Sequence, residues 1–378
     1  MPKHLAHRSI PPASPANIRY WRLLLVPLVF LLERALVRFP GFSERVYARG
    51  LFPLIGQTLN FLTGWIPFSL AELTAWLLGL AAVLWLFGTV NRVARAGAGR
   101  RLRALWRRVA GVLVWAAGVY FWFVILWGLN YARLPFGTIA GLDVRPSSTA
   151  ELAELCTDLI DRANALRLEV QEDDDGVMRL NDSIPAALRR ASLGYREAAK
   201  TYSALGGRYG RPKGVISSKL WSYTGIAGIY FAWTGEANVN TAMPASAIPA
   251  AAMHEMAHQR GFAREDEANY IAYLICSFHP DADFRYSGVL SAVSESMFAL
   301  YKRDPDLYAE LGKRYSDGVR RDLQREYDFW RGYEGVVADV SERINDAYLK
   351  SNGQTDGVQS YGRMVDLLLA EYRQNKGR

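Results

Sequence analysis

Two long stretches near the start of the chain carry no charged residue at all. One runs from Val109 to Leu129 and the other from Leu73 to Val90, and both are rich in aromatic and branched aliphatic side chains. A helix needs roughly 20 apolar residues to cross the hydrocarbon core of a bilayer. Tryptophan and tyrosine suit the two interfaces of a membrane. The pattern therefore predicts two membrane-spanning helices here.

A third apolar run, from about Tyr20 to Val37, is weaker. Pro27 interrupts it, and Glu33 and Arg34 lie within it. It could be a signal peptide or an interfacial helix, but no small-residue cleavage site follows its core, which favours a retained helix. We therefore expect three N-terminal transmembrane helices, at about 20–38, 69–90 and 109–129, in a membrane domain of residues 20–130 that follows a basic tail at 1–19.

After residue 130 the pattern becomes that of an ordinary globular domain, which we place at 131–378. A linker is followed by apolar positions at helical spacing. Short β-like runs then appear, and helices dominate again from about residue 246. The expected class is α+β and mostly helical. The segments behind this expectation are helices at 147–168 and 184–205, strands at 215–216, 226–233 and 237–240, one long amphipathic segment at 307–349, and a last helix at 361–374.

The distribution of charge predicts the topology of the membrane domain. Residues 1–150 hold 17 Lys and Arg against 4 Asp and Glu, whereas the rest holds 28 against 33. Seven arginines lie between the second and third runs, at 91–108, with no acid among them. Short basic loops stay in the cytoplasm, so this loop and the basic tail are expected inside and residues after 130 outside. Nucleic-acid binding is the rival interpretation of the arginines, and a short loop between two spans disfavours it.

The residues with clear chemical potential are His254-Glu255-Met256-Ala257-His258. On a helix, residues four apart share a face, so both imidazoles can reach one metal ion. Zinc is the usual ion for such ligands, and Glu255 is then the expected general base. Only two cysteines are present, Cys156 and Cys276, which excludes a disulfide scaffold and any CxxC-type site.

A catalytic zinc needs a third protein ligand, and acidic residues follow a turn at Gly261. If Glu265 faces the metal, Ala268, Asn269 and Ala272 lie on the same helical face, where alanines allow close approach and Asn269 can hydrogen-bond an imidazole. If Glu267 faces it instead, bulkier side chains meet the first helix. Glu265 is preferred and Glu267 stays the alternative, since either acid could simply be a favourable charge at a helix N-terminus.

The motif and its continuation, Glu265-Asp-Glu-Ala268-Asn269, resemble the signature of gluzincin metallopeptidases, which implies a zincin-like domain with Glu265 as the third zinc ligand. The chain also resembles an uncharacterised bacterial family of HExxH membrane proteins, which implies a membrane-anchored zinc peptidase. The stretches that carry this second resemblance are 44–53, 64–69, 228–231, 234–240, 254–274 and 345–369.

The sequence thus predicts a zinc-dependent metallopeptidase of the bacterial inner membrane that cleaves peptides or envelope proteins outside the cytoplasm. A catalytically silent zinc sensor and a structural envelope protein are the alternatives. Because the motif lies about 125 residues beyond the last apolar run, cleavage within the bilayer is disfavoured. Tyr348 or Tyr361 could stabilise an oxyanion. Residues 229–231 could bind a peptide as an added strand, although a plain core strand explains them equally well.

Overall fold

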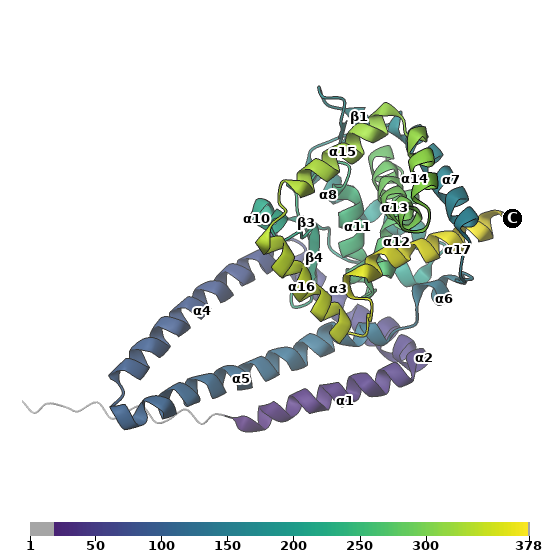
Figure 1. Cartoon of the computed structure of the whole chain (residues 1–378). Helices are drawn as coiled ribbons and strands as arrows, with labels where there is room; N and C mark the ends of the chain where they lie inside the picture. Colours follow the sequence, from purple (N-terminus) through teal and green to yellow (C-terminus); the bar gives the residue numbers. More distant parts are fainter. Residues whose placement is uncertain (1–18, 377–378) are drawn as a thin grey trace, which may run out of the picture.

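The computed structural model describes residues 19–376, which form a helical body and an arm of long helices (Figure 1). Apart from Arg19, the basic tail expected at 1–19 lies outside the described residues. In the first 130 residues the helices are α1 (Leu25–Arg38), α2 (Pro40–Ser43), α3 (Phe52–Thr63), α4 (Leu70–Arg95) and α5 (Arg101–Leu126), with the 3₁₀ turn η1 (Tyr20–Leu24), the π-helix η2 (Glu44–Leu51) and the 3₁₀ turn η4 (Gly128–Ala132).

The body is mostly helical, as predicted, with a few very short strands. Its helices are α6 (Phe136–Ala140), α7 (Thr149–Arg167), α8 (Ile184–Arg190), α9 (Ser192–Ala198), α10 (Ser218–Ser222), α11 (Ile248–Gln259), α12 (Glu265–Ser277), α13 (Ala282–Arg303), α14 (Pro305–Leu311), α15 (Asp317–Arg331), α16 (Val336–Ser351) and α17 (Met364–Lys376), with the 3₁₀ turn η7 (Gly357–Arg363). The strands are β1 (Gln171–Glu172), β2 (Met178–Arg179), β3 (Lys213–Gly214), β4 (Gly228–Phe231) and β5 (Glu236–Val239).

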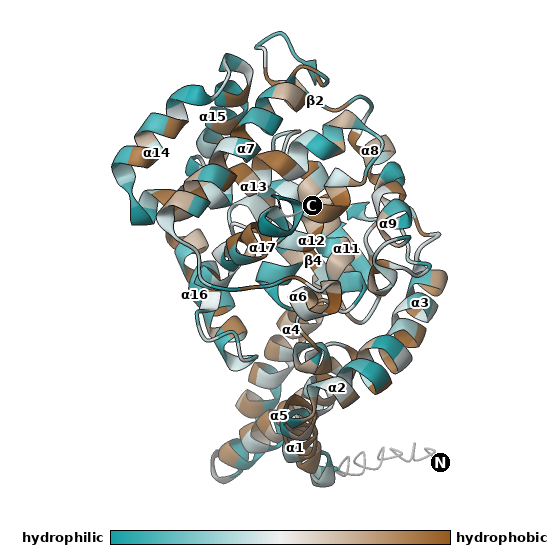
Figure 2. Ribbon diagram, turned by 90° about the vertical axis from the view of Figure 1, so that its right-hand side faces the viewer, coloured by the Kyte–Doolittle hydropathy of each residue, from teal (hydrophilic) through white to brown (hydrophobic). Residues whose placement is uncertain are grey.

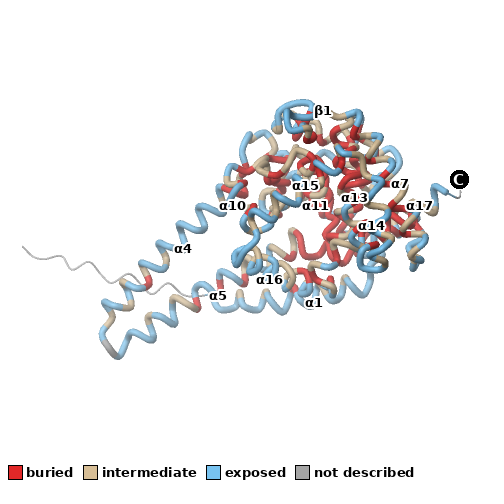
Figure 3. The backbone as a smooth tube through the Cα atoms, turned by 45° about the horizontal axis from the view of Figure 1, so that its top comes forward, coloured by how far each residue is buried: buried red, intermediate tan, exposed pale blue. Residues whose placement is uncertain are grey.

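Within the described residues, two helices are long and apolar enough to cross a membrane, α4 and α5, with 26 residues each. The expectation of three such helices is therefore too high by one. Helix α1 has only 14 residues and contains Glu33 and Arg34, which shortens its apolar stretch. It packs along α5 in the arm, whose surface is largely exposed in contrast to the buried centre of the body (Figures 1 and 3).

Both long helices extend into the arginine-rich segment that was expected to be a loop. Helix α4 continues to Arg95 and α5 begins at Arg101, so only a short turn separates them. Arginine is a good helix former, and therefore loss of apolar character does not end a helix. At the other end, α5 stops at Leu126, three residues before the apolar run does.

Packing contacts cross the boundary expected at residue 131. Helix α3, on the N-terminal side, contacts the body through buried Asn60, which accepts a hydrogen bond from Gln259 Nε2 at 3.0 Å and donates one to the Gly235 carbonyl at 3.0 Å. The segment between α1 and α4 therefore packs with the body and not with the arm alone.

The first turn of α4 is also fixed by the body. The carboxylate of Glu236 accepts hydrogen bonds from the backbone N–H groups of Leu70 and Ala71, at 3.2 and 2.8 Å. Glu72 accepts from the N–H groups of Ile216 and Ser217, at 2.8 and 2.6 Å. The Glu236 contacts satisfy N–H groups that a helix N-terminus leaves without an intrahelical partner, and the Glu72 contacts join the same turn to the segment before α10. The start of α4 is thus anchored to the body.

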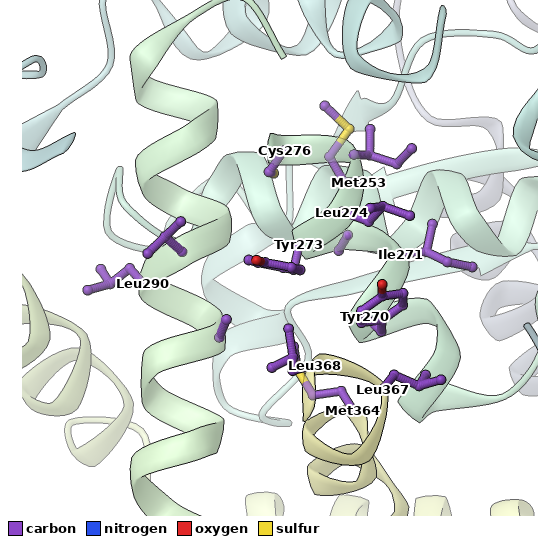
Figure 4. Packing of buried hydrophobic residues seen from close by; sticks show 14 of the residues in the cluster. Met253, Tyr270, Ile271, Tyr273, Leu274, Cys276, Leu290, Met364, Leu367 and Leu368 are labelled. Carbon is purple, nitrogen blue, oxygen red and sulfur yellow. The ribbon is translucent and has the colours of Figure 1, made fainter. Parts of the chain in front are cut away.

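The main hydrophobic core lies where α11, α12 and α13 pack with α7 and α17 (Figure 4). Residues of α12 such as Tyr270, Ile271 and Leu274 are buried, and Leu367 and Leu368 of α17 close the same cluster. Helix α12 is buried on nearly every side, and it is this central position that allows a side chain on its first turn to face α11.

A small sheet lies beside α11. Its strand order is β3-β5-β4, with β3 parallel and β4 antiparallel to β5, and Ile229 opposite Asn238. Strand β4 is thus at an edge. The long amphipathic segment expected at 307–349 is broken into α14, α15 and α16, because the chain bends after Leu311 and again before Gly335, whose φ is +150°. Positive φ is readily available to glycine, and an amphipathic pattern alone does not reveal such a break.

Candidate metal centre

Both histidines of the motif lie on α11. Pro249 near its start and four alanines within it suit a narrow helix that neighbours can approach closely. His258 is buried and the His254 side chain is 14% exposed. The two rings are edge to face, with centroids 4.6 Å apart, so both imidazoles lie on one face as the spacing predicts.

A glycine turn brings the following helix back onto this face. Helix α11 ends at Gln259, and Gly261 has a φ of +77°. The N–H of Gly261 donates to His258 O at 2.9 Å, and that of Phe262 donates to Ala257 O at 3.3 Å. Left-handed glycine after a helix is a common C-terminal cap. Helix α12 then starts at Glu265, four residues later.

The turn places Glu265 against both imidazoles. Its Oε2 lies 3.1 Å from His254 Nε2 and 3.5 Å from His258 Nε2. One ligand atom from each of the three residues lies within 4.8 Å of the others, which is a spacing that could hold a metal ion. The structure therefore brings together the three residues that the sequence named as ligands, although their role as ligands stays a prediction.

The alternative third ligand faces another part of the molecule. Glu267 Oε1 accepts hydrogen bonds from the backbone N–H of Phe136 at 2.9 Å and from Arg264 Nη1 at 2.7 Å. These contacts fix α6 and the start of α12 to each other. Glu267 is thus committed to packing between elements, and Glu265 is the acid that shares a site with the histidines.

The other nitrogen of each imidazole has a hydrogen-bond acceptor as its partner. His258 Nδ1 lies 2.6 Å from the Phe262 carbonyl, and His254 Nδ1 lies 2.7 Å from Asn269 Oδ1. The amide of Asn269 is oriented because its Nδ2 donates to the Tyr361 carbonyl at 3.3 Å. With Nδ1 as the donor, each Nε2 keeps a lone pair directed at the shared site. The set of two imidazoles and one carboxylate suits zinc.

Glu255 lies beside this cluster under strand β4. It is buried, and the backbone N–H of Tyr230 donates to its carboxylate. The fit is close, since a Cβ placed on Gly228 would meet Glu255 Oε1 at 2.5 Å. Its Oε2 has no protein partner although it is buried. Buried polar atoms are normally satisfied, so a carboxylate oxygen without a protein partner beside three potential ligands fits a site that holds water or a metal ion.

The charged groups of the cluster strongly shift one another's pKa values. Burial alone lowers the pKa of His258, but the carboxylate of Glu265 raises it by more, to about 9. Burial raises the pKa of Glu265, but the two imidazoles lower it by more, to well below its usual range. Burial raises the pKa of Glu255, against the opposing effect of both histidines. The protonation states of His258, Glu265 and Glu255 are therefore coupled to one another.

Both tyrosines proposed from the sequence reach the same cluster from the C-terminal segment. The Tyr361 hydroxyl donates to the Glu265 carboxylate and lies 3.4 Å from Asn345 Nδ2. Tyr348 accepts a hydrogen bond from Trp127 Nε1 at 3.0 Å, and burial raises its pKa. Helix α16 and turn η7 thus bring two phenols near Glu265.

Sequence reasoning missed two aromatic residues at the end of α5. The ring of Trp127 meets His258 edge to face at 5.4 Å, and Tyr131 donates to the Tyr348 hydroxyl at 3.3 Å. The sequence assigned Trp127 to the membrane run and Tyr131 to a linker. A separation of about 125 residues had suggested a site remote from the spans, yet the chain folds back onto the end of α5. Distance along a chain does not measure distance in space.

Fold and site together define a mostly helical protein with two candidate membrane helices and a His-His-Glu cluster that could hold a metal ion. The chain belongs to a family described as protein of unknown function (DUF3810), whose model matches residues 47–369. That match covers most of the chain, including the whole of both long helices and the whole cluster. Neither the curated proteins nor the solved structures contain a match to this chain.

Proposed function

We propose that the protein is a membrane-anchored zinc metallopeptidase. The observation that carries the proposal is the meeting of His254 Nε2, His258 Nε2 and a Glu265 carboxylate oxygen within 4.8 Å, with the unpartnered Oε2 of Glu255 beside them. A structural metal site requires ligands only. A buried carboxylate with a free oxygen next to the ligands is the additional group that hydrolysis requires.

When bound, zinc supplies a Lewis acid that polarises a carbonyl group and makes a water molecule more acidic. Glu255 would accept a proton from the attacking water at its free Oε2 and return it to the leaving amine. The N–H of Tyr230 holds the Glu255 carboxylate in position. Tyr348 is suited to donate to the negative charge that develops on the substrate oxygen, since burial raises its pKa and the phenol stays protonated at neutral pH. Tyr361 already donates to Glu265 and is suited to orient that carboxylate.

A peptide substrate has a place to bind in an extended conformation. Strand β4 is at the edge of the small sheet, and the same strand holds Glu255 through Tyr230. An extended peptide added to this edge would bring its backbone alongside the general base. This supports peptide hydrolysis over chemistry on a compact small molecule.

The test compares wild type with Glu255→Gln in the full chain, because the body includes residues before 131. The variant keeps the three ligands and should bind as much zinc as wild type. Its cleavage of a broad peptide library should fall on the order of 100- to 10,000-fold, as is typical when a general base is lost. Zinc content is measured by atomic spectroscopy and cleavage by mass spectrometry.

Glu326→Gln is the matched control, since this half-buried carboxylate accepts a hydrogen bond from Ser246 at 2.6 Å, away from the cluster. It should leave cleavage unchanged. Cleavage that survives Glu255→Gln would refute the proposed base. A wild-type protein that holds zinc and cleaves nothing in the library would favour the zinc-sensor alternative.

We further propose that the protein resides in the bacterial inner membrane, with the body outside the cytoplasm. The turn at 96–100 and η1 are at the end of the arm away from the body, and seven arginines lie near that turn (Figure 1). Positive charge favours the cytoplasmic side. The segment 39–69 lies on the side of the body, where α3 packs. A phosphatase reporter should be active when fused after residue 140 and inactive near residue 100, and the reverse pattern would overturn this topology.

A further inference from the structure

The candidate site lies directly beyond the end of a proposed membrane span. Helix α5 ends at Leu126, and the ring of the next residue, Trp127, contacts His258. Aromatic contacts connect this point to the strand at the edge of the sheet. Phe123 of α5 stacks on Trp233 at 5.8 Å, and Trp233 meets Phe231 of β4 at 5.5 Å. The aromatic side chains beside the candidate site, Trp127, Trp233 and Phe231, therefore continue the surface of α5.

The other long helix, α4, does not pack against α5 along its middle. Every residue from Ala75 to Leu84 is exposed, and ten consecutive helical residues cover all faces, so α4 has no packing partner along this stretch. It is nevertheless fixed at both ends. The body anchors its first turn, and near its last turns Arg108 donates to Thr89 Oγ1 at 3.0 Å and to Trp85 O at 3.2 Å. The two helices diverge between these points (Figure 1).

Helix α16 extends between the body ends of α4 and α5. At its start, Tyr333 meets Tyr223, which follows α10, and α10 adjoins the first turn of α4 through the contacts of Glu72. At its other end, Tyr348 contacts Trp127. The exposed apolar side chains of α16 are Val336, Val337, Val340 and Ile344, at 77%, 56%, 49% and 66%. At 3.6 residues per turn these four positions share one face, which we name the α16 stripe, and Tyr348 continues it.

We propose that the substrate is a membrane-anchored protein, whose apolar helix lies between α4 and α5 and whose adjoining extended segment passes the α16 stripe into the site. This inference rests on the proposed peptidase function and adds the class of substrate. A bond that reaches His254 and His258 has to lie within a few residues of the membrane boundary that Trp127 marks. The α16 stripe contacts a chain leaving the bilayer there, and β4 receives it.

Continuity with the site distinguishes this occupant from lipid alone. Lipid would cover the whole of α4 and would not require an apolar stripe that leads from α10 to the tyrosines beside Glu265. The ligand cluster itself is largely buried, with His258 and Glu265 side chains 7% and 10% exposed, which suits a thin extended segment and excludes a folded domain. A substrate held in the membrane also gains effective concentration at such a site, by a factor of about 100 or more for a well-matched tether.

The experiment uses the full chain in lipid nanodiscs and two forms of one library. In the first form, a single apolar helix anchors a randomised peptide segment in the nanodisc. The segment leaves the bilayer on the same side as the body of the protein. In the second form the same segment is free in solution. Mass spectrometry follows both. We expect the anchored form to be cleaved at least about tenfold more efficiently, and Glu255→Gln to abolish cleavage of both.

A double variant, Val340→Asn with Ile344→Asn, tests the α16 stripe. It should reduce cleavage of the anchored form severalfold, because the extended segment that leaves the bilayer loses its apolar contact. The matched control is Leu168→Asn, since Leu168 is 88% exposed and precedes β1 at the end of the body away from the arm (Figure 1). It should change cleavage of neither form.

The outcomes separate this inference from the function on which it rests. Equal cleavage of both forms, dependent on Glu255, would overturn the inference and leave the peptidase intact. Cleavage of neither form by a zinc-loaded wild type would refute both. Cleavage of the anchored form that the double variant does not reduce would show that the α16 stripe contacts lipid only, and would overturn its role in substrate binding.

Discussion

Helices α11 and α12 and helices α4 and α5 are both pairs joined by a short turn, but only the first pair is packed along its length. The α11–α12 pair is lined by alanines and joined by the hydrogen bond from His254 to Asn269. The α4–α5 pair is joined near its turn by Arg108 and diverges beyond it. Figure 2 shows the difference in hydropathy, with the arm predominantly hydrophobic and the body mixed.

The comparison shows that apolar surface alone does not bring two helices together. In water, burying the apolar face of α12 is strongly favourable, and small residues then decide how closely α11 approaches. In a bilayer, lipid solvates apolar side chains as well as another helix does, so small residues and polar contacts decide association. Arg108 and Thr89 supply one such contact at the end of α4 and α5, and Ala75 to Leu84 supply none.

The largest expected effect is to empty the candidate metal centre between α11 and α12. His258→Ala should reduce bound zinc from about one per chain to a small fraction, because three protein ligands are the usual minimum for such a site. Arg108→Leu, which breaks the polar joint of α4 and α5 instead, should leave zinc content unchanged. Metal analysis of the purified full chain measures both, and zinc retained in His258→Ala would contradict the ligand set.

A smaller pair of effects separates metal binding from packing within α12. Glu265→Ala should lose most of the zinc and keep the fold. Glu267→Ala should keep the zinc and lower the free energy of unfolding by about 1–3 kcal/mol, since it leaves the buried N–H of Phe136 without its acceptor. Denaturant unfolding and zinc content are measured for both variants. The opposite assignment of the two losses would move the third ligand to Glu267.

The last comparison takes one glycine from each pair and measures stability alone. Gly261→Ala forces a side chain into a φ of +77° and brings its Cβ to 2.6 Å from Asn130 Oδ1. We expect a loss of about 2 kcal/mol or more in unfolding free energy, from backbone strain and displacement of neighbours. Gly79→Ala in α4 meets nothing within 4 Å and should stay within about 0.5 kcal/mol of wild type. A large loss from Gly79→Ala would show that α4 has a neighbour there.

The local sequence was sufficient to predict how α11 and α12 are arranged. The motif, the glycine turn and the small residues at helical spacing place Glu265 on the correct face, and Asn269 was expected beside an imidazole for the same reason. All of these residues lie within 20 positions of one another. Helix periodicity and turn chemistry act over that range, so the relative positions follow from rules for neighbours in the chain.

The wall of the site could not be predicted in this way. Trp127, Tyr230 and Tyr348 meet around the histidines from three distant segments, and nothing in their own neighbourhoods indicates a partner. The hydropathy of α4 likewise predicts a span but not its anchored start, which depends on Glu236. Such contacts depend on tertiary packing, in which many pairings of aromatic and polar groups are locally equivalent.

The anchored start of α4 separates two events during synthesis of the chain. Glu236 follows Leu70 by 166 residues, and Ile216 follows Glu72 by 144. In the proposed topology, α4 partitions into lipid as it emerges from the ribosome, before the groups that complete its first turn have been translated. Insertion would therefore precede the anchoring of this first turn, which requires β5 and the segment before α10. The final angle of a span translated early is set by residues translated late.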